Sequence, residues 1–360
     1  MPAIHACLEA LSPGAPVHAG RLTVVPLLAE GPFAESPYLL LDEAVQSKLL
    51  DISEVSEAGV VANLLATNLS PKPVLLFDGE ELKGAKQNRI LNATILVPAG
   101  AKLTLPVSCV EQGRWRYEAA GFAPSGEALF AKARLKKAER MAGARRAVHA
   151  RRANASLAPD LAPDLAPELA PELAPELAPD LSEAGPIRAS ARRAEALGDF
   201  DADQGAVWDD VKEALRETGT RSASSAMHDS YVLRREEIER LSSAFVPADD
   251  QVGAVFYIDG RAAGIEVAGS PRAFGAIFGK IVRSYCLNAL GQKPPFELPA
   301  PEAVKSFIAA VTGLDQMASP SVGMGEDVRL DGPSACGSAL LSEGHVVHLS
   351  AFSKAAFEPA

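Results

Sequence analysis

Residues 74–118, VLLFDGEELKGAKQNRILNATILVPAGAKLTLPVSCVEQGRWRYE, decide how the first part of this chain folds. The runs at 74–77, 90–97 and 103–110 are apolar or β-branched, and Gly, Pro, Asn and Asp separate them, which is typical of strands joined by turns. Two charge-dense loops, at 78–89 and 109–116, each follow such a run. A chain that needed only an apolar core would not gather charges there, so we predict that the two loops are the walls of a site.

The rest of the chain combines strands with helices. Further strand-like runs lie at 22–28, 38–41 and 60–67, and one short helix is expected at 42–50, so the first 120 residues predict a β-sandwich or barrel-like lobe. In the second half, helices are expected at 204–217, 236–245, 271–290 and 303–311, and strands at 252–258, 262–267, 327–330, 337–341 and 345–352. We predict an α+β fold, in which the N-terminal mostly-β lobe packs with a C-terminal α+β lobe.

Shifts in composition divide the chain into five expected parts. These are a flexible N-terminus at 1–20, the mostly-β lobe at 21–125, a basic helix at 126–155, a disordered insertion at 156–186 and the α+β lobe at 187–355. The insertion contains six tandem Leu-Ala-Pro-[Asp/Glu] tetrads at 157–180, and a proline at every fourth position excludes an α-helix. The basic helix could contact nucleic acid or a membrane, but such a charge run is more often a solvated face.

Charge and cysteine content exclude several classes of protein. The chain has 360 residues and a formal net charge of -11, which argues against general binding to nucleic-acid phosphates. We recognise neither a secretory signal nor an apolar run of about 18 residues, so we expect a cytoplasmic protein without a membrane span. The four cysteines lie far apart and form no CxxC pair, which indicates reduced thiols.

The first loop holds candidates for acid–base chemistry and for ligand binding. Glu80 and Glu81 lie between glycines, and neighbouring carboxylates can act as general acid and base or hold a divalent ion. The alternative is a polar hairpin tip with internal ion pairs. The loop also offers cations, amides and a guanidinium fork that suit a phosphorylated sugar or nucleotide: Lys83, Lys86, Gln87, Asn88 and Arg89.

The second loop adds candidates of the same kinds. Glu111 is a third possible general base, while Gln112 and Arg114 are candidate ligand contacts and Trp115 either stacks on a ligand or packs against the protein. Cys109 could be a nucleophile whose thiolate Arg114 stabilises, although a buried, inert thiol is the more common outcome. From the second half of the chain, His228 and His348 are candidate contributors.

Several longer motifs resemble those of one bacterial family, the ARG and Rhodanese-Phosphatase-superfamily-associated protein domain. They are DGEELKGAKQNRILNATILVPAG at 78–100, PVSCVEQGRW at 106–115, DQGAVWDDV at 203–211, SSAMHD at 224–229, QVGAVFYIDG at 251–260 and HVVHLSAF at 345–352. The resemblance runs from about Leu22 to Phe352, and the tandem repeat departs from it. It implies partners among ADP-ribosylglycohydrolases and rhodanese- or phosphatase-like proteins, and a link to ADP-ribose or other NAD-derived nucleotides. It supplies no catalytic residues.

Two functions from different classes are compatible with these observations. The first is binding of a phosphorylated small molecule of the ADP-ribose type, with phosphate on Arg89 and Arg114 and with hydroxyls or a base on Glu81, Gln87, Asn88 and Gln112. The second is a hydrolase or transferase that uses Glu80, Glu81 or Glu111 as general base, with or without a divalent metal. A structural or protein-interaction role is a third hypothesis. The sequence leaves the cofactor and the reaction open.

Overall fold

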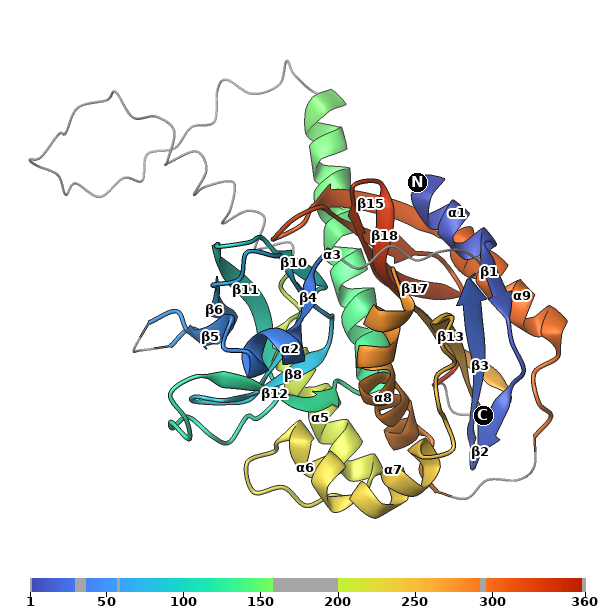
Figure 1. Cartoon of the computed structure of the whole chain (residues 1–360), viewed down its shortest axis with the longest axis horizontal. Coiled ribbons are helices and arrows are strands. Elements are labelled where there is room, and N and C mark those ends of the chain that lie inside the picture. The colour runs from blue at the N-terminus through green and yellow to red at the C-terminus, as the bar shows by residue number, and fades with distance from the viewer. Residues whose placement is uncertain (1, 30–36, 57–58, 158–199, 292–295, 358–360) are drawn as a thin grey trace, which may run out of the picture.

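The computed structural model describes residues 2–29, 37–56, 59–157, 200–291 and 296–357, and these residues confirm the predicted α+β fold. A large sheet with helices on both faces lies beside a smaller, curled β lobe (Figure 1). The predicted insertion at 156–186 lies outside the described residues, except that helix α3 (Ala131–Leu157) continues to its first positions.

The large sheet has nine antiparallel strands in the order β1-β3-β13-β14-β18-β17-β16-β15, with β2 also paired to β3. The strand expected at 22–28 belongs to this sheet and not to the β lobe, because Val25 pairs with Val255. The strands are β1 (Leu11–Pro13), β2 (Val17–Ala19), β3 (Leu22–Ala29), β13 (Gln251–Ile258), β14 (Arg261–Ala268), β15 (Asp315–Pro320), β16 (Glu326–Asp331), β17 (Ala335–Ser342) and β18 (His345–Ser353).

Successive residues of β13 face opposite sides of this sheet, so each side has its own apolar core. Phe256 faces helix α8 (Pro271–Asn288) and stacks on Tyr285 with 4.1 Å between the ring centroids. Val255 faces the other core, which includes residues of α1 (Pro2–Glu9) and α9 (Pro301–Thr312). The N-terminal residues that we expected to be flexible therefore include a helix, whose Ile4 and Leu8 are buried in this second core.

The β lobe consists of a six-stranded sheet in the order β12-β8-β9-β11-β6-β5 and a three-stranded sheet in the order β10-β7-β4. Helix α2 (Leu41–Gln46) lies between β4 and β5 in the sequence. The strands are β4 (Leu39–Leu40), β5 (Leu50–Glu54), β6 (Asn63–Asn68), β7 (Val74–Leu76), β8 (Glu80–Gly84), β9 (Arg89–Leu91), β10 (Ile95–Val97), β11 (Lys102–Cys109) and β12 (Phe122–Ala128). The sequence pattern missed β5, β8 and β12.

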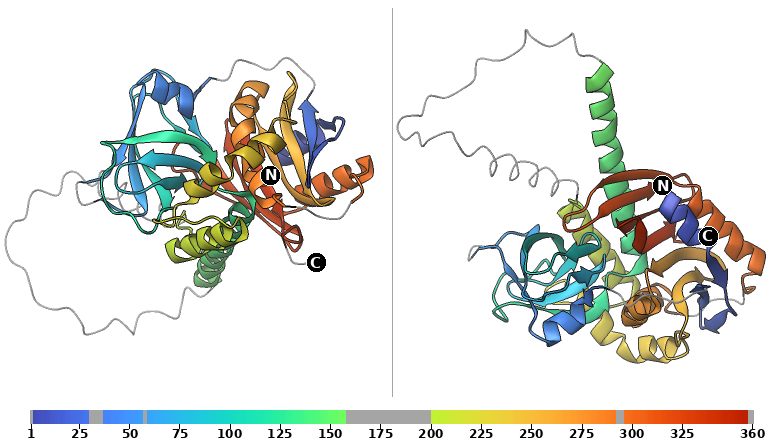
Figure 2. Two further views of the ribbon diagram at one scale, coloured as in Figure 1. Left: turned by 90° about the horizontal axis from the view of Figure 1, so that it is seen from below. Right: turned by 45° about the horizontal axis from the view of Figure 1, so that its top comes forward.

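Helix α3 lies between the β lobe and the large sheet, as both views in Figure 2 show. Three of its basic residues do not lie on the solvated face that we expected, whereas Arg146 is exposed. Arg134 and Lys137 are buried against Glu266 of β14 and Asp78, respectively. Arg145 is likewise buried and pairs with Asp327 of β16, 2.9 Å away. The charges of this helix therefore join the two parts of the molecule.

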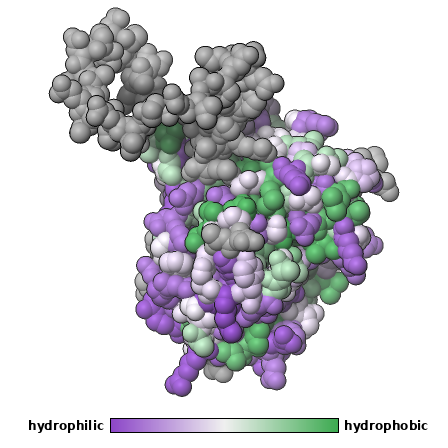
Figure 3. Space-filling model, turned by 90° about the vertical axis from the view of Figure 1, so that its left-hand side faces the viewer, coloured by the Kyte–Doolittle hydropathy of each residue, from purple (hydrophilic) through white to green (hydrophobic). Residues whose placement is uncertain are grey.

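Three further helices, α5 (Gln204–Glu217), α6 (Met227–Leu233) and α7 (Arg235–Ser242), lie below α3 and α8 in Figure 1. On the face in Figure 3, hydrophilic and apolar residues are interspersed. Within the residues that the structure describes, no helix is long and apolar enough to cross a membrane.

Candidate functional site

The first polar loop is a strand, a tight turn and a second strand. β8 and β9 pair with Glu81 opposite Ile90. Gly84 has a φ angle of 140°, and a Cβ atom at this position would lie 2.2 Å from the carbonyl oxygen of Gly121, so glycine allows β12 to pair with β8 here. Glu80 and Glu81 are buried in β8, whereas their charge suggested an exposed loop.

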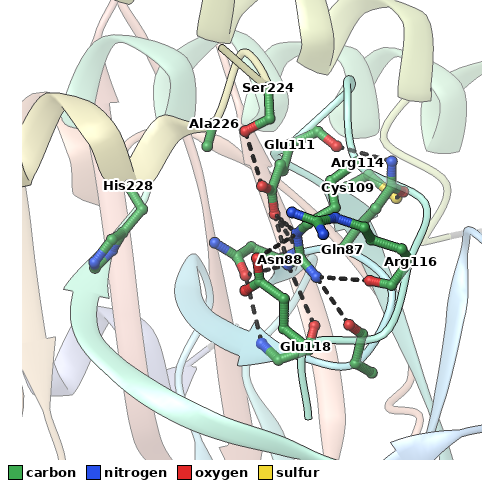
Figure 4. A network of polar contacts seen from close by, with 12 residues as sticks. Gln87, Asn88, Cys109, Glu111, Arg114, Arg116, Glu118, Ser224, Ala226 and His228 are labelled. Atoms are coloured by element: carbon green, nitrogen blue, oxygen red, sulfur yellow. Dashed lines mark hydrogen bonds and ion pairs between the residues drawn. The ribbon is translucent and has the colours of Figure 1, made fainter. Parts of the chain in front are cut away.

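Glu111 is the centre of a buried network that joins the two predicted loops (Figure 4). Its Oε2 accepts hydrogen bonds from Arg114 Nε at 2.8 Å and from the backbone N–H of Asn88 at 3.2 Å, and its Oε1 accepts one from Ser224 Oγ at 2.9 Å. Burial acts to raise the pKa of Glu111, but these three hydrogen bonds outweigh it and lower the pKa. Glu111 is thus an ionised anchor, and the geometry does not favour it as a general base.

The guanidinium group of Arg114 forms its hydrogen bonds within the protein. Nη1 donates to the carbonyl oxygens of Ala85 at 2.8 Å and Arg116 at 3.1 Å, and Nη2 donates to Asn88 Oδ1 at 3.0 Å. Gln87 closes the network, because its Nε2 donates to the carbonyl oxygen of Glu111 at 2.8 Å. Phosphate binding by Arg114 remains a prediction that this geometry does not favour.

Arg89 and Cys109 are also buried. Arg89 Nη1 donates to the carbonyl oxygen of Gln87 at 3.1 Å, and its Nη2 lies 3.8 Å from Glu54 Oε1. Cys109 Sγ lies 3.0 Å from Gln87 Oε1. Burial raises the pKa of the Cys109 thiol to about 12, although the charge of Arg89 opposes this shift. The thiol is therefore protonated at neutral pH, which favours the packing role over the nucleophile.

The remaining ligand candidates of the loops lie at the surface or pack on one another. Lys83 and Gln112 are exposed. The ammonium group of Lys86 lies 5.3 Å from the ring centroid of Trp115 and 5.2 Å from that of Tyr117, and Trp115 is 49% exposed. Trp115 thus packs on a cation of the protein itself.

Glu80 connects the β lobe to helix α8. Its Oε1 accepts a hydrogen bond from Lys280 Nζ at 2.6 Å, and its Oε2 accepts one from the backbone N–H of Phe77 at 2.8 Å. Lys280 also pairs with Asp42. Both carboxylate oxygens of Glu80 are therefore engaged, which favours a structural role over the predicted general base.

Glu81 differs from Glu80, because it reaches the second half of the chain. Its Oε2 lies 2.9 Å from His228 Nδ1, and its Oε1 has no hydrogen-bond partner among the described residues. The side chain of Glu81 is fully buried. The hydrogen bond from Glu81 raises the pKa of His228, although partial burial opposes the shift.

Gly113 of the second loop contacts the segment before α6, and this contact helps to place His228 beside Glu81. The backbone N–H of Gly113 donates to the carbonyl oxygen of Ser224 at 2.7 Å, and that of Met227 donates to Val110 at 2.8 Å. A Cβ atom at Gly113 would lie 2.8 Å from Ser224 Cα. The absence of a side chain at Gly113 therefore lets the segment before α6 dock on the second loop.

His228 lines a polar cavity of about 290 Å³ between the β lobe and helices α6, α7 and α8. Ser125 and Glu127 of β12 form one wall, and Arg283 of α8 forms another. Helix α7 contributes three polar side chains to the lining: Arg235, Glu239 and Ser242. Among the described residues, no ion pair engages Arg235, which is exposed. The cavity combines cations, carboxylates and hydroxyls.

Glu127 and Arg283 form an ion pair in the cavity wall. Arg283 Nε donates to Glu127 Oε2 at 2.8 Å, and its Nη2 donates to the carbonyl oxygen of Gly126. Burial raises the pKa of Glu127, and the nearby charge of Glu81 acts in the same direction, while Arg283 opposes both. The pair fixes the position of the Arg283 guanidinium group.

His348, the other histidine expected at the site, lies elsewhere. Its Nδ1 is 2.7 Å from Thr94 Oγ1, and its Nε2 is 3.4 Å from Glu266 Oε2 in the buried contact with α3. The structure therefore brings His228 to the cavity and Glu81 into contact with His228, but it does not bring His348 there. Within the described part of the chain, no group of three or more His, Cys, Asp or Glu side chains is arranged to hold a metal ion.

Sequence reasoning missed most of the cavity lining. Glu127, Arg235, Glu239 and Arg283 come from three elements and form no local motif. Their only sequence signal is a charge next to apolar helical or strand positions, and most such charges lie on ordinary solvated faces.

The fold and the cavity define a two-part α+β protein whose halves meet at buried ion pairs and around a polar hollow. The chain belongs to the family of the ARG and Rhodanese-Phosphatase-superfamily-associated Protein domain, which matches residues 10–156 and 182–352. This confirms the resemblance seen in the sequence. A search of curated proteins and a search of solved structures each found no match.

Proposed function

We propose that this chain binds a phosphorylated small molecule, of the class of ADP-ribose and other NAD-derived nucleotides, in the cavity that His228 lines. The observation that carries this proposal is the convergence of His228, Arg235 and Arg283 on one hollow. Guanidinium groups bind phosphate through charge-assisted hydrogen bonds, and the imidazole of His228 is a further polar group in the same hollow.

The uncharged and acidic groups of the same cavity suit the rest of such a ligand. Ser125, Ser242 and Glu239 line it together with the cations. Hydroxyl and carboxylate oxygens accept hydrogen bonds from sugar hydroxyls. The family name, which records an association with ARG and rhodanese-phosphatase superfamily proteins, supports a ligand of this class.

The proposed phosphate contacts differ from those expected from the sequence. Arg89 is fully buried and Arg114 donates to backbone and side-chain oxygens of the protein. A ligand would have to break these hydrogen bonds, and buried charges that lose their partners are costly. Arg235 meets no such obstacle, and Arg283 keeps its bonds to Glu127 and Gly126 through Nε and Nη2, while its Nη1 has no hydrogen bond to any described residue.

A thermal-shift panel tests the proposal with ADP-ribose, NAD, AMP and ribose 5-phosphate, each with and without Mg²⁺. A ligand that binds only the folded protein raises its melting temperature, with about 2.7 kcal/mol of stabilisation at 100 times the dissociation constant. We expect at least one compound to raise the melting temperature of the wild type. The proposal is wrong if none of them does so at millimolar concentration.

A further inference from the structure

We infer that the cavity is also catalytic, and that His228 is the general base that takes a proton from a water molecule as this water attacks the phosphoryl group of the ligand. The inference rests on the proposed binding of a phosphorylated molecule. In this hydrolysis a bond forms between phosphorus and the water oxygen, and the bond between phosphorus and the leaving oxygen breaks. The leaving oxygen gains the proton that His228 accepted, and no atom is oxidised or reduced.

The contact with Glu81 leaves one nitrogen of His228 ready to accept a proton. An ionised carboxylate only accepts hydrogen bonds, so Nδ1, 2.9 Å from Glu81 Oε2, carries the hydrogen in the neutral ring. The lone pair then belongs to Nε2. His228 lines the cavity, and Nε2 has no hydrogen bond to any residue that the structure describes. A carboxylate that orients an imidazole in this way is the arrangement that a histidine base requires.

The burial of Glu81 destabilises the folded protein, which argues against a purely structural role for this residue. It is fully buried, yet only one of its oxygens has a partner within the described residues. A buried polar atom that lacks a hydrogen bond destabilises the fold. Glu80, the adjacent residue, shows the alternative, because Lys280 and Phe77 engage both of its oxygens.

Charged groups from four elements lie around His228. Glu81 and Lys83 belong to β8, and Glu127 belongs to β12. Helix α7 brings Arg235 and Glu239 to the same cavity, and α8 brings Arg283. The two arginines could stabilise negative charge on the phosphoryl oxygens during attack, while Glu81 favours the protonated imidazole that results. Glu81 is thus a positioning residue and His228 the catalytic one.

The test measures binding and turnover on the same full-length protein. ADP-ribose and p-nitrophenyl phosphate serve as probes, with and without Mg²⁺, and product is followed by chromatography and by absorbance. We expect His228→Gln to lower kcat by roughly 10²–10⁴-fold, the usual contribution of a general base. His345→Gln is the matched control, because His345 is exposed on β18 and away from the cavity.

Glu81→Gln distinguishes a positioning role from a structural one. The amide can still accept the hydrogen bond from Nδ1, but it lacks the charge that favours the protonated ring. We therefore expect the rise of kcat/KM with pH to move to lower pH in this variant. Circular dichroism and melting curves show whether each variant is folded.

The two proposals fail in different ways. If ADP-ribose raises the melting temperature but the wild type hydrolyses neither probe, the catalytic inference is wrong and the binding proposal stands. Turnover that persists in folded His228→Gln would also overturn the inference, as would an unshifted pH profile in Glu81→Gln. If neither binding nor turnover is seen, both proposals are wrong.

Discussion

His228 Nδ1 and Glu81 Oε2 lie 2.9 Å apart, although 147 positions separate the two residues in the sequence. The contact connects α6 with the buried strand β8, and it places the imidazole ring in the wall of the polar cavity. The docking of the segment 224–227 on the second loop helps to hold α6 where this contact forms.

The His228–Glu81 contact should make stability depend on pH. The contact raises the pKa of His228 above its ordinary value, so its stabilising contribution is full below about pH 6.5 and is lost as the pH rises through the folded-state pKa. We expect the free energy of unfolding to differ more between wild type and His228→Gln at pH 6 than at pH 8.5. Urea denaturation at both pH values measures this difference, and other titrating groups cancel in the comparison. An equal difference at both pH values would contradict the prediction.

The ion pair of Arg134 with Glu266 should matter greatly to the fold. Both side chains are fully buried, and Nη1 lies 2.5 Å from Oε1. Removing one partner leaves a buried charge without compensation, so Arg134→Met should lower the free energy of unfolding by about 3–5 kcal/mol. Lys212→Met is the control, since Lys212 and Asp209 form an exposed pair, and such pairs contribute about 0–1 kcal/mol. Similar losses in both variants would show that α3 is not anchored through Arg134.

Arg114 should stabilise the loops through its geometry and not through charge alone. Its guanidinium group reaches Ala85, Asn88 and Glu111 together, and a lysine ammonium group cannot reproduce this fork. We expect Arg114→Lys to lower the melting temperature nearly as much as Arg114→Ala, whereas exposed Arg116 should tolerate alanine. Full rescue by lysine would contradict this role.

The thiol of Cys109 should be inert in the folded protein. Burial raises its pKa to about 12, so the reactive thiolate is scarce at pH 8. We expect 5,5′-dithiobis(2-nitrobenzoic acid) to label Cys109 only after urea unfolds the chain, and Cys109→Ala to keep ligand binding. Rapid labelling of the native protein at Cys109, located by peptide mass mapping, would revive the nucleophile hypothesis.

Local sequence patterns predicted where helices and strands lie better than they predicted which strands pair. The hairpin of β13 and β14 follows from two apolar runs around Asp259 and Gly260, which the structure confirms. The pairing of β3 with β13 does not follow from any local signal, because it joins residues more than two hundred positions apart. The sequence thus indicated the α+β class but placed β3 in the wrong sheet.

The roles of the charged residues were the hardest feature to predict from the sequence. The density of charges at 78–89 and 109–116 indicated that these loops meet, and the Glu111 network shows that they do. Most of these charges are buried, and Asp78, Glu80 and Glu81 pair with residues of other elements, which no spacing reveals. Buried Arg134 and exposed Arg235 look alike in the sequence, and only the fold assigns one to an ion pair and the other to a cavity.

Calorimetric titration of ADP-ribose into wild type, Arg235→Ala and Arg240→Ala tests the central claim most directly. Both arginines belong to α7 and are exposed, but only Arg235 lines the cavity, so the two variants change the overall charge equally. Loss of a charge-assisted contact worth about 1.5–3 kcal/mol should weaken binding by at least about tenfold in Arg235→Ala and leave Arg240→Ala like the wild type. Equal affinity in all three proteins, or no binding by the wild type, would contradict the assignment of this cavity as the ligand site.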